Sequence, residues 1–142
     1  MGNGIEEHRA ALRAIPLFAA LPDDQLALLA EVAATVDVAP GRTIARQGEV
    51  GSGLFVILEG RVRVVRDGET LTRLGRGEFF GELSVLDRLP RVASVVAEEP
   101  TRCLAIAAWD AEQLLLAHPA VTLALLRTLA GRLRQTTTDH HH

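Results

Sequence analysis

A glycine-led turn, a carboxylate and a guanidinium lie within one short stretch of the chain. Gly81 and Glu82 begin this stretch, and Arg91 follows nine residues after Glu82. A glycine can adopt backbone angles that let successive N–H groups converge on an anion, and a helical turn starting there adds its positive end. The planar fork of an arginine fits a phosphate. Because a carboxylate would repel the phosphate, its natural partner is a hydroxyl donor such as a ribose 2′-OH. The stretch therefore predicts a site for a ribose phosphate.

Two motifs around these residues resemble a known family. Phe80-Gly81-Glu82-Leu83-Ser84, followed by Pro90-Arg91-Val92-Ala93-Ser94-Val95, resembles the phosphate-binding cassette of the cyclic nucleotide-binding domain. This module occurs in protein kinase A regulatory subunits, cyclic-nucleotide-gated channels and the catabolite activator protein. The run from Gln47 to Val64 resembles a second motif of the family, and Leu17–Pro22 resembles its N-terminal helical entry. Two ordered motifs at the expected separation are a specific signal.

The resemblance implies a role for each residue of the cassette. Arg91 would pair with the exocyclic phosphate oxygens, and Glu82 with the Gly81 backbone would hold the ribose 2′-OH. The predicted ligand site also includes Phe80 and the backbone N–H groups near Leu83, Ser84, Ala93 and Ser94. The apolar wall around the base is predicted to consist of Val62, Val64, Leu74 and Val92. The structural alternative for Glu82 and Arg91 is an ion pair with each other.

Val92 determines which base we expect. Family members that favour guanine usually carry Thr or Ser directly after the cassette arginine, where a hydroxyl can meet the guanine 2-amino group. Val92 offers only methyl groups, so the expected ligand is cAMP in preference to cGMP. The resemblance further implies that the C-terminal helix closes over the base as a lid and reports occupancy. We expect no cofactor and no metal, because His118 has no metal-ligating partner at a suitable spacing.

The hydrophobic period changes twice along the chain. Apolar residues at helical spacing predict N-terminal helices over about 6–36, interrupted by Pro16 and Pro22. Alternating runs between turn signals predict a β-roll over about 40–107, and helical spacing returns over about 110–135. The resemblance implies a mainly β fold, an antiparallel β jelly-roll barrel with helices at both ends. The predicted strands are 43–45, 54–58, 61–64, 70–74, 93–97 and 102–106.

Length and composition bound the class of protein. A chain of 142 residues predicts one domain, residues 1–138, with His140–His142 as a purification-tag remnant. All 15 basic residues are arginine, a bias typical of GC-rich bacterial genomes. The single cysteine, Cys103, excludes an internal disulfide and favours core packing in a reducing, cytoplasmic compartment. No apolar run reaches the length of a membrane span.

Three classes of function can be weighed. The first is a regulatory module that binds a cyclic nucleotide and signals through its C-terminal helix. The second is the sensor half of a catabolite-activator-like transcriptional regulator whose DNA-binding domain is absent from this chain. A net charge of −3 disfavours nucleic-acid binding by the chain itself. The third, a cupin-type enzyme, would need a histidine cluster that the sequence lacks, so no catalysis is expected.

The C-terminal helix has two apolar stripes. Leu123, Leu126, Ala130 and Leu133 recur at spacings of three, four and three, and Leu125 and Leu129 form a neighbouring stripe. Two interpretations remain open. Both stripes cover the β core, or the first forms a homodimer contact. The effector that responds to the ligand is not identified by the sequence.

Overall fold

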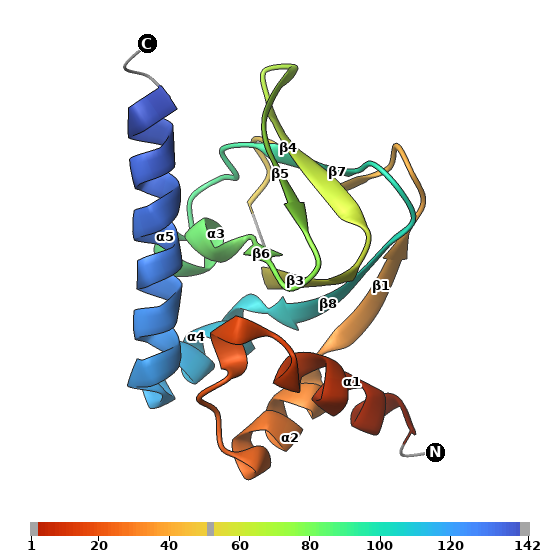
Figure 1. Ribbon diagram of the computed structural model, residues 1–142, viewed down its shortest axis with the longest axis vertical. Coiled ribbons are helices and arrows are strands. Elements are labelled where there is room, and N and C mark those ends of the chain that lie inside the picture. Colours follow the sequence, from red (N-terminus) through yellow and green to blue (C-terminus); the bar gives the residue numbers. More distant parts are fainter. Residues whose placement is uncertain (1–2, 51–52, 140–142) are drawn as a thin grey trace.

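The computed structural model describes the backbone of residues 3–50 and 53–139, and the side chains of residues 4–50 and 53–136. The predicted tag residues, His140–His142, lie outside the described residues. Three N-terminal helices cover one end of a β-roll, and a long C-terminal helix stands beside it (Figure 1). The helices are α1 (Asn3–Arg13), the 3₁₀ turn η1 (Pro16–Phe18), α2 (Asp23–Val32), α3 (Glu82–Asp87), α4 (Ala108–Ala117) and α5 (Pro119–Asp139).

Two prolines divide the N-terminal helices. Pro16 opens η1, and Pro22 directly precedes α2. The first turn of α2 contains two acidic residues, whose negative charges interact favourably with the positive end of the helix dipole. The prediction of helix up to residue 36 is wrong at its end. Helix α2 stops at Val32, and strand β1 (Ala34–Val38) begins two residues later. Its branched residues favour extended backbone, and the strand pairs with the last strand of the roll.

Eight antiparallel strands form two four-stranded sheets. The orders are β1-β8-β3-β6 and β2-β7-β4-β5. The two sheets stay separate among the described residues, so the roll is an open pair of sheets rather than a closed barrel. All six predicted strands are confirmed, and β1 and the two-residue β6 are additional. The strands are β1, β2 (Thr43–Ala45), β3 (Gly53–Glu59), β4 (Arg61–Arg66), β5 (Glu69–Gly75), β6 (Phe79–Phe80), β7 (Ser94–Ala97) and β8 (Thr101–Ala107).

The apolar core has two parts that meet at β3. Val56 points into the cluster under the helices, and its neighbour Ile57 points into the cluster between the sheets. Both are fully buried, because successive side chains of a strand face opposite ways. Cys103 lies in the second cluster, where burial raises the pKa of its thiol to about 12. The prediction that Cys103 packs in the core is confirmed.

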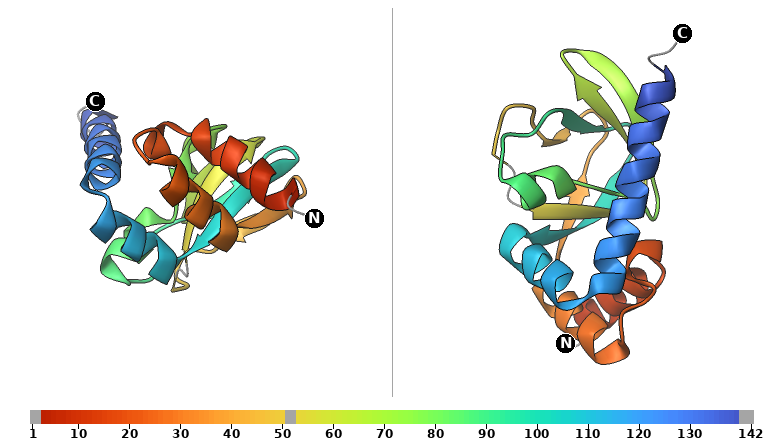
Figure 2. Two further views of the ribbon diagram at one scale, coloured as in Figure 1. Left: turned by 90° about the horizontal axis from the view of Figure 1, so that it is seen from below. Right: turned by 90° about the vertical axis from the view of Figure 1, so that its left-hand side faces the viewer.

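The C-terminal helices turn sharply at His118 (Figure 2). Val121 and Leu125 of α5 are 1% exposed and join the core, whereas Leu126 and Leu133 are 51% and 68% exposed. The two stripes of α5 therefore differ, and only the stripe containing Leu125 covers the core. Within the described residues, no single helix has the length and apolar character of a membrane span. The pair α4 and α5, bent by 110°, meets those criteria only when taken together.

Candidate functional site

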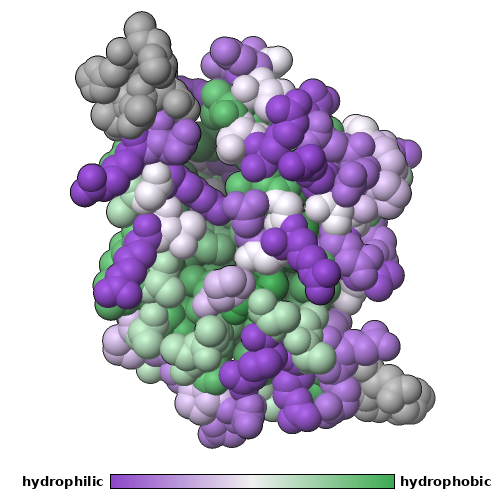
Figure 3. All heavy atoms as spheres, viewed as in Figure 1, coloured by the Kyte–Doolittle hydropathy of each residue, from purple (hydrophilic) through white to green (hydrophobic). Residues whose placement is uncertain are grey.

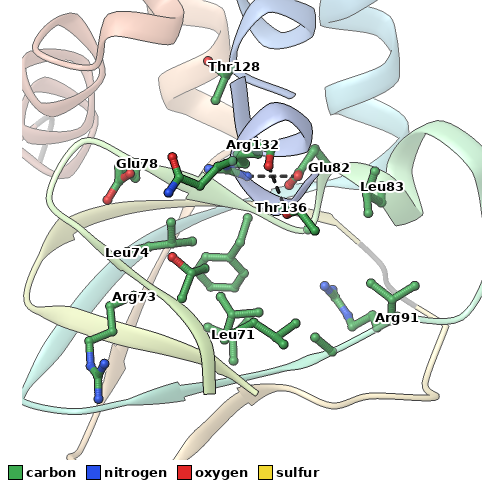
Figure 4. A pocket seen from close by; sticks show the side chains of 18 of the residues that line it. Leu71, Arg73, Leu74, Glu78, Glu82, Leu83, Arg91, Thr128, Arg132 and Thr136 are labelled. Atoms are coloured by element: carbon green, nitrogen blue, oxygen red, sulfur yellow. Dashed lines mark hydrogen bonds and ion pairs between the residues drawn. The ribbon is translucent and has the colours of Figure 1, made fainter. Parts of the chain in front are cut away.

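A cavity of about 890 Å³ lies between the sheet containing β4 and β5, helix α3 and helix α5 (Figure 4). Most of the residues predicted from the cassette and the apolar wall line this one cavity. They are Val64, Leu74, Phe80, Gly81, Glu82, Leu83, Ser84, Arg91, Val92 and Ala93. The fold thus brings together the carboxylate and the guanidinium from the two ends of the cassette.

Val62 and Ser94 do not line the cavity. Val62 is fully buried between the sheets, where it pairs with Leu74 across the strands. Its prediction as a wall residue is therefore corrected, because it packs in the core beneath the wall. The hydroxyl of Ser94 accepts a hydrogen bond from the Gln47 backbone N–H at 2.9 Å. Through this hydrogen bond, the Ser94 side chain links β7 to the segment that follows β2.

Gly81 makes the turn into α3. Its φ is +92°, in the left-handed region that favours glycine. A Cβ at this position would lie 2.5 Å from the Gly53 carbonyl oxygen and 3.3 Å from Arg91 Nη1. Both the backbone conformation and the close approach of β3 therefore require glycine. The same distance places the Arg91 guanidinium next to the start of α3, where the first helical N–H groups have no partner within the helix.

Glu82 is buried and paired with an arginine from the far end of the chain. Only 7% of the residue is exposed, and its Oε1 accepts a hydrogen bond from Arg132 Nη1 at 3.0 Å. Burial raises the pKa of Glu82, and the charges of Arg132 and Arg91 only partly oppose that increase. Arg132 also donates to the Phe79 carbonyl at 2.7 Å and lies 4.6 Å from the centre of the Phe79 ring. Helix α5 is thereby tied to the cassette.

Arg91 is held without a carboxylate contact. Its guanidinium carbon lies 5.8 Å from the centre of the Phe55 ring, which stacks on Phe80. Burial lowers the pKa of Arg91, against the opposing attraction of Glu49 and Glu82. Among the described residues, no carboxylate lies within ion-pair distance of Arg91. The alternative of a Glu82–Arg91 ion pair is therefore not what the structure contains, since Glu82 pairs with Arg132.

Helix α5 supplies a wall of the cavity, and sequence reasoning expected this helix near the base but did not name its residues. Five residues of α5 line the cavity, and they recur at intervals of three and four, so they form one stripe of the helix. They are Thr128, Gly131, Arg132, Gln135 and Thr136. Figure 4 shows Arg132 and Thr136 beside Glu82. The spacing of the polar residues along α5 could have indicated this stripe. Nothing local in the sequence, however, indicates which strand or turn the stripe faces.

The family model described as the cyclic nucleotide-binding domain matches residues 35–118. The chain belongs to this family. Domains of this family bind cyclic nucleotides and are regulatory rather than catalytic. The match covers both sheets and α3, and it stops before α5. Among the described residues, no group of three His, Cys, Asp or Glu could hold a metal ion.

Similar proteins differ in the ligand that their names record. The cyclic AMP receptor protein of Thermus thermophilus is 36% identical over 129 residues, covering 87% of this chain and 60% of its own length. A cGMP-dependent protein kinase of Eimeria tenella is 33% identical over 100 residues, which is 70% of this chain and 10% of the kinase. This chain therefore spans less than two thirds of both relatives.

Solved structures extend the likeness to the fold. The regulatory subunit of a cAMP-independent protein kinase A from Trypanosoma brucei superposes with a TM-score of 0.82 at 30% identity. The superposition covers 89% of this chain and 46% of that subunit. A triple mutant of the same subunit is bound to cAMP in its A site, with a TM-score of 0.81, 30% identity and coverage of 89% and 47%.

Proposed function

We propose that the cavity between α3 and α5 binds a 3′,5′-cyclic nucleotide. The observation that carries this proposal is the position of the Arg91 guanidinium beside the Gly81 turn, where none of the described carboxylates is its ion-pair partner. A half-buried cation at the start of a helix suits an anion, because both the charge and the free N–H groups favour it. In this proposal Arg91 and the N–H groups near Leu83, Ser84, Ala93 and Ser94 hold the cyclic phosphate.

Glu82 is proposed to bind the ribose. Arg132 contacts one oxygen of the carboxylate, Oε1, and in this proposal the 2′-OH donates a hydrogen bond to the carboxylate beside that contact. The carboxylate lines the cavity and is largely buried. A hydroxyl that donates to it there would add a hydrogen bond to a charged group, which is stronger than one between neutral groups.

The favoured base is adenine. Val92 lies on the cavity rim with 58% of its surface exposed, and it offers no hydroxyl to a guanine amino group. Leu74, Val64 and Leu71 add apolar surface on the sheet side of the cavity. Relatives named for cAMP and for cGMP both occur, so family membership alone does not select the base.

Calorimetric titration with cAMP, cGMP and cCMP tests both the binding of a cyclic nucleotide and the preference for adenine. We expect saturable binding of one molecule per chain, with cAMP bound most tightly. A wild-type protein that binds no cyclic nucleotide would contradict the proposed function. A preference for cGMP would contradict only the choice of base.

The proposed output is a movement of α5. Because Arg132 of α5 and the ribose share one carboxylate, ligand binding changes the surroundings of a contact that holds the helix. The exposed seam of Leu123, Leu126 and Leu133 on the same helix is proposed as a homodimer contact. The alternative function is that of the sensor part of a longer transcriptional regulator. A Mycobacterium tuberculosis relative named as a cAMP-activated global transcriptional regulator favours it, because this chain spans 56% of that protein at 33% identity.

A further inference from the structure

A glycine interrupts the stripe of α5 that faces the cavity. Gly131 lies between Thr128 and Gln135, one turn from each, and all three line the cavity. A Cβ at Gly131 would meet no atom within 4 Å. A glycine inside a helix weakens the helix relative to alanine. Neither a positive φ nor a close neighbour requires glycine here. The missing side chain instead leaves a recess in the α5 wall of the cavity.

The recess lies next to the place where the sugar is held in the proposed function. Gly131 directly precedes Arg132, whose guanidinium is 3.0 Å from the Glu82 carboxylate. In a nucleotide the base is carried by C1′, which is bonded to the carbon that bears the 2′-OH. A sugar whose 2′-OH meets Glu82 therefore brings its base within reach of the α5 residues that neighbour Arg132.

The opposite wall has a different chemistry. Leu71 and Leu74 of β5 face the cavity from the sheet side and offer apolar surface. Thr128 and Gln135 flank the recess with a hydroxyl and an amide. A flat ring with one apolar face and a polar edge matches these two walls.

We infer that Gly131 is a recess in α5 that receives the edge of the nucleotide base, and that the depth it adds favours a purine over a pyrimidine. This inference rests on the proposed function. It adds a residue that selects the ligand by size, on a helix outside the matched family region.

Filling the recess tests the inference. We expect Gly131→Val to weaken binding of cAMP at least about tenfold, because overpacking a fitted contact is destabilising on that scale. Binding of the smaller cCMP should weaken less, so the ratio of the two dissociation constants should fall. The matched control is Ala130→Val, which adds the same branched side chain to the same turn. Ala130 is exposed and does not line the cavity, so its variant should bind both ligands within about twofold of wild type.

A milder substitution separates binding from folding. Gly131→Ala should raise the midpoint of thermal unfolding by about 2 to 4 °C, since alanine is the better helix former, and should weaken binding of cAMP. A structural role for the glycine would change both properties in the same direction. Isothermal titration and thermal unfolding of the full chain measure the two effects.

The outcomes distinguish this inference from the proposed function. If wild type binds cAMP and Arg91→Ala does not, the proposed function holds. If Gly131→Val then binds cAMP like wild type, or Ala130→Val loses as much affinity as Gly131→Val, the recess is not the base site. If wild type binds no cyclic nucleotide, the proposed function fails and the inference fails with it.

Discussion

Arg91 is the side chain on which the ligand proposal depends most. We expect Arg91→Ala to remove tight binding of cAMP while the domain stays folded. Truncating one partner of a desolvated charge pair costs about 2 to 5 kcal/mol, which is roughly 30-fold to several thousand-fold in affinity. Calorimetric titration measures this loss. Arg88→Ala is the control, because that side chain is 69% exposed and pairs with Glu112 outside the cavity. Equal binding by a folded Arg91→Ala protein would exclude this site.

Glu82 can be tested through the ligand as well as through the protein. Wild type should bind 2′-deoxy-cAMP at least about tenfold more weakly than cAMP, because the buried carboxylate loses a donor. In Glu82→Ala the two ligands should bind alike, since the contact they differ in is gone. Competition binding gives all four affinities. If the affinity lost by removing the 2′-OH and the affinity lost by Glu82→Ala simply add, Glu82 does not contact the 2′-OH.

The burial of Glu82 also predicts a dependence of stability on pH. Burial raises the pKa of Glu82 above its ordinary value of 4.5, so the folded state holds this proton more tightly than the unfolded state. The associated stability is present below pH 4.5 and is lost as pH rises through the folded-state pKa. Wild type should therefore lose stability relative to Glu82→Gln as pH rises above 4.5. Urea unfolding across that range measures the difference, and parallel curves would contradict the assignment.

At the scale of elements, the β-roll could be predicted from the sequence because its strands alternate locally. The six runs between turn residues contain their own signal, and so does the Gly81 turn. Strand β1 was missed because it is only five residues long and directly follows α2. Its apolar residues continue the apolar pattern of that helix. The two residues of β6 are a strand only through pairing with β3. Arg132 was missed because its ion pair with Glu82 spans 50 residues, and no local spacing encodes such a contact.

Helix α5 divides into two halves with different supports. Val121 and Leu125 anchor the first half in the core, whereas the ion pair of Arg132 holds the second half. We expect backbone amides from residue 130 onward to exchange faster than those of the first half, and to gain protection when cAMP binds. Hydrogen exchange with and without cAMP measures this. Equal protection of residues 130–136 in both states would show that the second half is a fixed part of the fold.

At the scale of the whole molecule, the exposed seam of α5 predicts self-association. The face seen in Figure 3 carries an apolar area over the lower part of α5 and the adjoining N-terminal helices. We expect Leu126→Glu combined with Leu133→Glu to convert a dimer into a monomer, because like charges would meet across the seam. Sedimentation velocity measures the change. Leu28→Glu is the control, since Leu28 is similarly exposed on α2. A wild-type protein that is already monomeric would exclude the dimer.

The length of α5 determines how far its far end moves when the helix tilts. The helix has 21 residues, and the core holds its first half as far as Leu125, so the arm from there to Asp139 is about 20 Å long. A tilt of about 20° at Leu125 would carry Arg132 about 3.5 Å, enough to break its hydrogen bond to Glu82, and the far end about 7 Å. If α5 tilts when the ligand binds, as proposed, its far end moves about twice as far as its contact with Glu82. A small change at the proposed ribose site would then become a larger displacement at the last turn of the helix.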